Sequence, residues 1–202
     1  MPVISNSPSS RTYISQRLRL HYLDWGNPEA PPLLLLHGGR DHCRNWDWIA
    51  QELCSKWHII APDLRGHGDS AHSPDGHYTM AAFVYDLAQL IHQQGLAPLS
   101  IVAHSLGGNI ALRYTGLYPE HVRRLVAIEG LGDAPNIISE RRKFPLFEQM
   151  QNWITEQRAM SSRQPRRYAT LEEALQRMMQ ENSHLSAERA RHLTVHGVSQ
   201  NE

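Results

Sequence analysis

Alternating apolar and polar positions in the first two-thirds of the chain predict short strands separated by helices. Residues 17–25 alternate, which is typical of a strand with one buried face. The unbroken run Leu33–Leu36 and the apolar run at 57–63 indicate strands covered on both faces, as in parallel sheets. Further strands are expected at 99–105 and 122–130, and helices at about 45–55, 79–94 and 107–118. This alternation predicts an α/β fold with a mostly parallel twisted sheet flanked by helices.

The pattern changes after Gly130, where the chain becomes polar and helical. Helices are expected at about 138–160, 171–181 and 187–195. Thr170 and Glu173 have the spacing of a capping box at the start of the second of these. We therefore predict a core over residues 1–132 and a helical cap or lid segment over 133–202.

Composition excludes several classes of protein. The 202 residues include 20 basic and 20 acidic side chains, so no net charge attracts nucleic acid or an anionic membrane. No apolar run approaches the ~20 residues of a membrane-spanning helix, and the first residues lack the pattern of a secretion signal. Cys43 and Cys54 are too few for a disulfide framework. We expect a cytoplasmic protein with no nucleic-acid or membrane partner, and the oligomeric state stays open.

The segment 101–109, IVAHSLGGN, places Ser105 between a predicted strand and a predicted helix. A serine on a tight strand-to-helix turn projects its hydroxyl away from the backbone, and small neighbours permit that turn. The helix N-terminus then points free amides at the reacting centre. Ser105 is therefore the candidate nucleophile; the alternative is a serine that only caps the helix.

A glycine pair follows the strand predicted at Leu33–Leu36 and forms the second part of the candidate site around Ser105. In His37-Gly38-Gly39, the glycines allow a backbone N–H to turn toward developing negative charge. Gly39 and Leu106 are the expected oxyanion-hole donors. We expect His37, Gly38 and His104 to line the substrate site, although the glycines would also suit a tight loop alone.

Three segments in this order, HGGRDHCRNW, APDLRGHGDS and VAHSLGGNIALRYTGLYPEHVRRLVAIEG, resemble the α/β-hydrolase-fold superfamily. The likeness spans about Leu18 to Gly130 and is strongest to bacterial esterase-type and serine hydrolase-like members, with Ala103 where glycine is commonest. It implies a small-molecule ester or acyl substrate, no cofactor and no metal. It also implies that Asp63 and Arg65 shape a loop whose members His67, His72 and His77 are structural or exposed.

The base of a serine hydrolase needs an orienting carboxylate, for which we select Glu129. It ends the strand at 122–130, at the sheet edge where Ser105 also lies. The resemblance places the acid after this strand in one branch of the superfamily, and Asp133 is the weaker alternative. That branch includes haloalkane dehalogenases with an aspartate nucleophile, so Ser105 favours acyl chemistry over dehalogenation or epoxide opening.

The sequence pattern contains no clear candidate for the histidine that would act as general base for Ser105. The resemblance places the catalytic histidine after the last strand, beyond the cap, and no such strand is predicted after Gly130. His184, His192 and His196 lie in the cap segment and are interpreted as surface histidines, whereas His121 is expected at the opposite end of the sheet. We therefore expect a truncated chain whose histidine lies beyond it. Its last strand would have an unpaired edge, and the isolated chain would be poorly stable.

Three functions remain open from the sequence. The first is a serine hydrolase of carboxylic esters or related acyl compounds. The second keeps the same catalytic groups for carbon–carbon hydrolysis, lactone opening or perhydrolysis, and the third is a non-catalytic binding module. Apolar cap residues favour an apolar acyl or aromatic group, unless they only pack against the core. These residues are Phe144, Leu146, Phe147, Met150 and Trp153.

Overall fold

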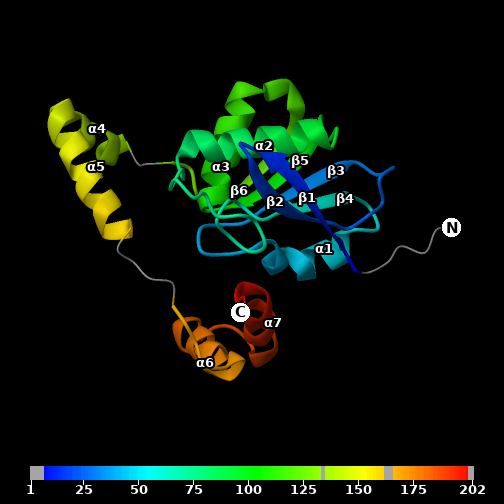
Figure 1. Ribbon diagram of the computed structural model, residues 1–202. Helices are drawn as coiled ribbons and strands as arrows, with labels where there is room; N and C mark the ends of the chain where they lie inside the picture. Colours follow the sequence, from blue (N-terminus) through cyan, green and yellow to red (C-terminus); the bar gives the residue numbers. More distant parts are fainter. Residues whose placement is uncertain (1–6, 133–134, 162–165, 200–202) are drawn as a thin grey trace.

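A computed structural model describes residues 7–132, 135–161 and 166–199 and shows a six-stranded sheet with helices on both faces (Figure 1). The strands lie in the order β1-β2-β4-β3-β5-β6; β3 to β6 form a parallel set, and the β1–β2 and β2–β4 pairs are antiparallel. The strands are β1 (Ser9–Ser15), β2 (Leu18–Asp24), β3 (Pro32–Leu36), β4 (His58–Pro62), β5 (Leu99–His104) and β6 (Val122–Ile128). The core helices are η1 (Cys43–Trp46), α1 (Asp47–Leu53), α2 (Met80–Gln93), α3 (Leu106–Leu117) and η2 (Pro119–His121). The predicted α/β class is confirmed.

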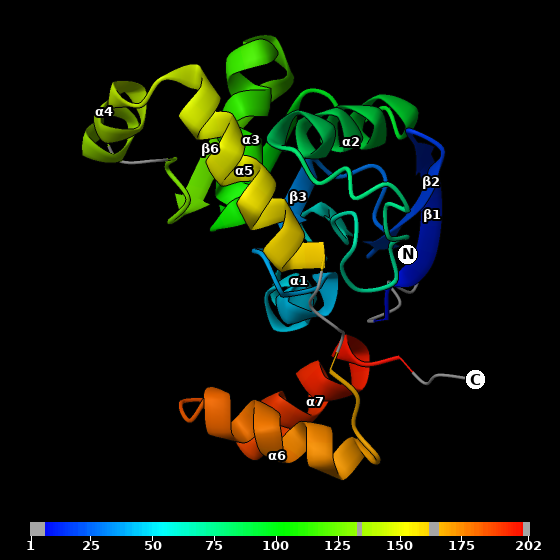
Figure 2. The ribbon, with the colours of Figure 1, turned by 60° about the vertical axis from the view of Figure 1, so that its left-hand side comes forward.

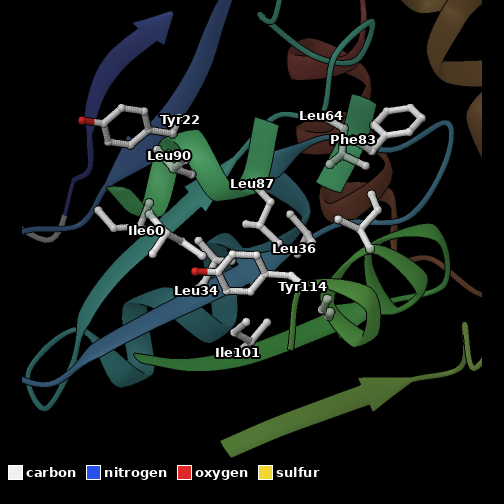
Figure 3. Close-up of a cluster of buried hydrophobic side chains, with 14 of the residues drawn as sticks. Tyr22, Leu34, Leu36, Ile60, Leu64, Phe83, Leu87, Leu90, Ile101 and Tyr114 are labelled. Atoms are coloured by element: carbon white, nitrogen blue, oxygen red, sulfur yellow. The ribbon is translucent and has the colours of Figure 1, made fainter. Parts of the chain in front are cut away.

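The leucine run of β3 is buried on both faces, as its composition predicts. Leu34 and Leu36 join a cluster with α2 and α3, which includes Leu87 and Ile110 (Figure 3). Leu33 and Leu35 point to the opposite face and join Trp46 and Ala50 at η1 and α1. Successive side chains of a strand alternate between faces, so one four-residue run connects both halves of the core.

Strand β1 was not predicted, because its sequence lacks an apolar alternation. Among the residues of β1, only Tyr13 and Ser15 are buried. The strand pairs along its whole length with β2, from Ser9 opposite Asp24 to Ser15 opposite Leu18. Backbone pairing with a neighbour, rather than side-chain burial, therefore defines this edge of the sheet.

The cap contains four helices, one more than predicted. They are α4 (Pro135–Lys143), α5 (Leu146–Ser161), α6 (Leu171–Glu181) and α7 (Ala187–Gly197). The expected helix at 138–160 is wrong, because the chain breaks at Phe144-Pro145, where proline cannot continue the preceding helix. One half of the capping box is present, because Glu173 N–H donates to Thr170 Oγ1 at 3.2 Å. The Glu173 carboxylate accepts from the N–H of Ala169, the residue before the N-cap, at 2.8 Å. None of the helices within the described ranges has the length and hydropathy of a membrane span.

Strand β6 forms one edge of the sheet. It pairs with β5, and no other strand of the described chain lies on its far side. Val126 and Ile128 are 53% and 46% exposed, although a β-branched pair of this kind is usual in a covered strand. The unpaired edge is as expected, and poor stability of the isolated chain stays a prediction.

A buried ion pair joins the loop after β4 to α2 and β1. Arg65 donates from Nε and Nη2 to the two carboxylate oxygens of Asp86, at 2.6 and 2.7 Å. The Ser15 hydroxyl donates to the same carboxylate at 2.6 Å, and Arg65 Nη1 donates to the His77 carbonyl at 2.7 Å. Both charged side chains are almost inaccessible, so water cannot solvate either charge if its partner is lost.

We predict that Asp86→Ala lowers the free energy of unfolding by about 3–5 kcal/mol, because it leaves the Arg65 charge buried and unpaired. Urea denaturation at neutral pH measures this change. Glu120→Ala is the control: Glu120 pairs with His121 on the surface, so its removal should cost no more than about 1 kcal/mol. Equal losses in the two variants would contradict the prediction.

Candidate active site

Ser105 occupies a strained turn between β5 and α3. Its φ of 50° and ψ of −112° lie outside the regions that residues with a side chain normally adopt. Two backbone hydrogen bonds hold it there. Ser105 N–H donates to the Ile128 carbonyl at 3.0 Å, and the Ser105 carbonyl accepts from Asn109 N–H at 3.1 Å. The predicted strand–turn–helix setting of this serine is confirmed.

Three glycines make the turn possible, because a side chain at any of them would collide with backbone. A Cβ at Gly107 would lie 2.6 Å from the His37 carbonyl oxygen, and one at Gly108 would lie 2.7 Å from that of Glu129. At Gly130, where φ is +70°, a Cβ would lie 1.8 Å from the Ser105 carbonyl oxygen. The ends of β3, β5 and β6 are therefore packed backbone to backbone around Ser105.

The loop after β3 lies directly against this turn. A Cβ at Gly38 would lie 3.3 Å from Ser105 Cβ and 2.9 Å from His104 Nδ1, and one at Gly39 would lie 3.7 Å from the Leu106 side chain. In the part of the chain that the structure describes, the N–H groups of Gly39 and Leu106 donate no hydrogen bond to a protein atom. Two free backbone donors therefore flank the serine.

His37 is completely buried, and its ring is hydrogen-bonded to the loop after β3 and to the loop after β4. Its Nδ1 lies 2.6 Å from the Gly38 carbonyl, and its Nε2 accepts from Leu64 N–H at 3.0 Å. Burial lowers the pKa of His37 to about 4, so the ring is neutral at neutral pH and Nδ1 is the donor. Both ring nitrogens are thus bonded within the protein. A contact of His37 with substrate stays a prediction.

Asp63 links the loops after β3 and β4. Its carboxylate accepts from the N–H of Cys43 at 2.7 Å, the N–H of Asp69 at 3.0 Å and His21 Nδ1 at 2.7 Å. Burial alone would raise the pKa of Asp63, but the hydrogen bonds from His21 and from the two amides outweigh it and lower the pKa to about 2. A Cβ at Gly68 would lie 2.3 Å from this carboxylate. The loop glycine is therefore required by the network around Asp63.

Sequence spacing did not reveal that His21, Cys43 and Asp63 meet in the interior. Their potential ligand atoms all lie within 4.8 Å of one another, close enough to hold a metal ion. Each Asp63 oxygen already accepts a strong hydrogen bond, and His21 Nε2 lies 2.9 Å from the Ser10 hydroxyl. Hydrogen bonds within the protein thus occupy the carboxylate and both His21 nitrogens.

Glu129 lies immediately after β6, next to the serine turn. Its backbone has a positive φ of 63°, and its side chain is exposed. The carbonyl of Ile128 accepts a hydrogen bond from Ser105 N–H, so Glu129 and Ser105 lie at the same edge of the sheet, as expected. Within the described residues the Glu129 carboxylate forms no hydrogen bond or ion pair. Asp133, the alternative acid, lies outside the described residues.

A cavity of about 720 Å³ lies between the core loops and the cap helices α6 and α7, and Ser105 itself is not among the residues that line it. Gly39 and His104, which flank Ser105, contribute to its wall. Cap residues on the other side include Asn182, His184 and His196. The apolar residues of α5, from Leu146 to Trp153, do not line it; α6 and α7 form the cap wall instead. Figures 1 and 2 show these two helices packed together below α1.

No described histidine is bonded to the Ser105 hydroxyl. His121 lies before β6, at the far end of the strand from Ser105, with its Nδ1 2.9 Å from the Tyr114 hydroxyl. His67 has its Nδ1 2.9 Å from the Arg65 carbonyl, and its ring lies 5.3 Å from that of His37. Of the cap histidines, His184 is exposed, and His192 contacts Asp47 of the core.

The sequence is similar to a known protein family and to two curated proteins. Residues 31–188 match the family model described as alpha/beta hydrolase fold. The chain is 31% identical over 170 residues to "Serine hydrolase-like protein" of Danio rerio, covering 82% of this chain and 51% of that protein. It is 30% identical over 173 residues to "Serine hydrolase-like protein 2" of Homo sapiens, covering 81% and 52%. The chain thus spans about half the length of these curated relatives.

A solved structure, that of the hypothetical protein PA1622 from Pseudomonas aeruginosa PAO1, shares this architecture. It superposes with a TM-score of 0.80 at 25% identity, over 96% of this chain and 67% of the other.

We predict that Gly130→Ala lowers the free energy of unfolding by about 2 kcal/mol or more, because the new methyl group collides with the Ser105 carbonyl in a left-handed conformation. Gly116→Ala on α3 is the matched control. A Cβ there meets open space, and alanine favours the helix by up to about 1 kcal/mol. Chemical denaturation compares the two. An unchanged stability in Gly130→Ala would show that the turn does not need glycine.

Stability should also fall in acid, in two steps. The pKa of His37 is lowered to about 4, so between pH 6.5 and 4 only the unfolded chain binds its proton, and about 3 kcal/mol of stability is lost as the pH falls. Asp63 contributes about 2 kcal/mol above pH 4, which is lost as the pH falls toward its folded pKa of about 2. Urea melts across this range measure both steps. His37→Gln should remove the slope between pH 4 and 6.5, and an unchanged slope would contradict the assignment.

Proposed function

Because the chain belongs to the alpha/beta hydrolase fold family, we propose that it is a serine hydrolase of carboxylic esters or related acyl compounds, with Ser105 as the nucleophile. The observation that supports this most is the Ser105 backbone, held at φ 50° and ψ −112° beside two unbonded N–H groups. Strained backbone of this kind persists where the surrounding structure enforces it, and it is concentrated at functional sites. A serine that only caps a helix accepts a hydrogen bond from an N–H of the first turn, and the Ser105 side chain accepts none there.

The proposed reaction begins when the Ser105 oxygen attacks the substrate carbonyl and its proton passes to a histidine base. The carbonyl oxygen becomes negative and would accept hydrogen bonds from the N–H groups of Gly39 and Leu106. The alcohol then leaves with the proton from the histidine, and water releases the acyl group by the same steps. A donor pair of this kind matters nearly as much as the nucleophile, since removing one donor typically costs about 2.7–4 kcal/mol.

Glu129 is proposed as the carboxylate that orients the base. Its position at the sheet edge next to the serine turn supports this role, and its exposed side chain leaves it available to a partner. We propose that the base is a histidine outside the described residues, because no described histidine is bonded to Ser105. Activity is therefore assigned to the complete protein.

The remaining parts of the site have supporting roles in this proposal. The proposal keeps a catalytic core over residues 1–132 and a cap segment over 133–202, of which α6 and α7 cover the cavity. Gly38 and His104 border the substrate, while His37 fixes the loop that carries Gly39. The cap side of the cavity mixes polar residues such as Asn182 with apolar ones such as Leu185 and Leu193, so it suits an acyl group with both apolar and hydrogen-bonding parts.

Two alternatives share the same fold. Carbon–carbon hydrolysis, lactone opening or perhydrolysis would use the same nucleophile and donors. A non-catalytic binding module would explain why no described base contacts Ser105, but it would not explain the free N–H groups beside it.

The test uses the complete protein with a fluorophosphonate probe and a panel of p-nitrophenyl esters. We expect the probe to label Ser105 and Ser105→Ala to lose labelling and at least about 10³-fold in kcat/KM. Ser73→Ala, in the exposed loop before α2, is the matched control and should keep both. No labelling of wild-type protein would favour the binding module. Labelling with no turnover of any ester would favour one of the other hydrolytic reactions.

A further inference from the structure

A buried carboxylate lies where the cap helix α7 meets the core. Asp47, the first residue of α1, is only 5% exposed. Its Oδ2 lies 3.3 Å from Arg44 Nη1 and 3.1 Å from Nε2 of His192, which comes from α7. The contact with His192 has the distance of an ion pair, but in the described chain neither His192 Nε2 nor Asp47 Oδ1 has a hydrogen-bond partner. A buried carboxylate needs compensating positive charge, and the cap supplies one of the two groups in position to give it.

The same histidine makes the main aromatic contacts across this junction. The His192 ring lies 4.8 Å from that of Trp48, and the Arg189 guanidinium lies 5.5 Å from the Trp48 ring. At the next residue of α7, the Leu193 carbonyl lies 3.0 Å from His42 Nε2. His42 belongs to the loop that also carries Gly39. Contacts of α7 thus reach both α1 and the loop that flanks Ser105.

We propose that His192 is a positioning residue whose protonated imidazole pairs with Asp47 and holds α7 against the core, so that closure of the cap over the cavity weakens as the pH rises. The docking of α7 is inferred from the contacts described above. The effect of this docking on turnover rests on the proposed function.

The charges around His192 give the sign of this dependence. Asp47 is the acidic group in contact with it, and it attracts the ring only while the ring carries a proton. The cations nearby are Arg44 of η1 and Arg189 of α7 itself, and the neighbouring His196 ring lies 4.7 Å away. Burial, and then the charge of Arg44, lower the pKa of His196, so protonation of this ring is disfavoured. Docking is thus strongest while His192 is protonated and weakens as imidazoles lose their protons.

The docking test is hydrogen exchange of the amides in residues 187–197, in the full chain, at pH 5.5 and 8.5 after correction for intrinsic rates. Wild-type protein should lose about fivefold protection in α7 at the higher pH. His192→Gln and Asp47→Asn, which keep the side-chain size, should each show the weaker protection at both pH values. His92→Gln on the surface of α2 is the control and should behave as wild type. Protection that is independent of pH in wild type, or a pH dependence that survives in either variant, would overturn the proposal.

A catalytic readout separates this proposal from the proposed function. In the complete protein, His192→Gln should raise KM at pH 5.5 to the value that wild type shows at pH 8.5, with kcat changed less than twofold. Ser105→Ala should leave the exchange of α7 unchanged. Inactive wild-type protein with pH-dependent docking would refute the proposed function and keep the role of His192. Active wild-type protein whose hydrogen exchange in α7 does not depend on pH would refute the role of His192 and keep the proposed function.

Discussion

The strained backbone at Ser105 is the constraint on which the rest of the structure depends. A positive φ at a residue with a side chain costs free energy, and this cost must be met by the surrounding packing. Here Gly107, Gly108 and Gly130 let the ends of three strands approach so closely that the serine has no room to relax. The bond from Ser105 N–H to Ile128 then fixes the turn to the edge strand. The position of the hydroxyl is therefore set by backbone contacts.

The groups beside the serine are fixed by a separate network of buried polar residues. His37 supports the glycine loop. The Asp63 carboxylate joins three segments, because it accepts from Cys43 N–H after β3, from Asp69 N–H after β4 and from His21 of β2. Both groups have pKa values shifted so that their native charge state persists at neutral pH. The core thus presents a nucleophile and two N–H donors in a rigid arrangement. The cap, by contrast, meets the core through a few polar and aromatic contacts at His192.

The sequence was most informative where one local pattern determined the outcome. The run Leu33–Leu36 predicted a strand buried on both faces, and the small residues around Ser105 predicted the turn. It was least informative where distant segments meet. Strand Ser9–Ser15 is defined by pairing with its neighbour and has no apolar alternation of its own. Pro145 divides a helix whose apolar pattern continues across it, and the partners of Asp63 come from three separate segments.

The central claim, that Ser105 faces two N–H donors able to bind an oxyanion, is tested most directly by a crystal structure of the complete protein after reaction with a small alkyl phosphonate. The account predicts a covalent bond from the Ser105 oxygen to phosphorus. It also predicts a phosphoryl oxygen within about 2.7–3.1 Å of the backbone nitrogens of both Gly39 and Leu106. A phosphoryl oxygen that points into solvent, or an adduct on another residue, would contradict it.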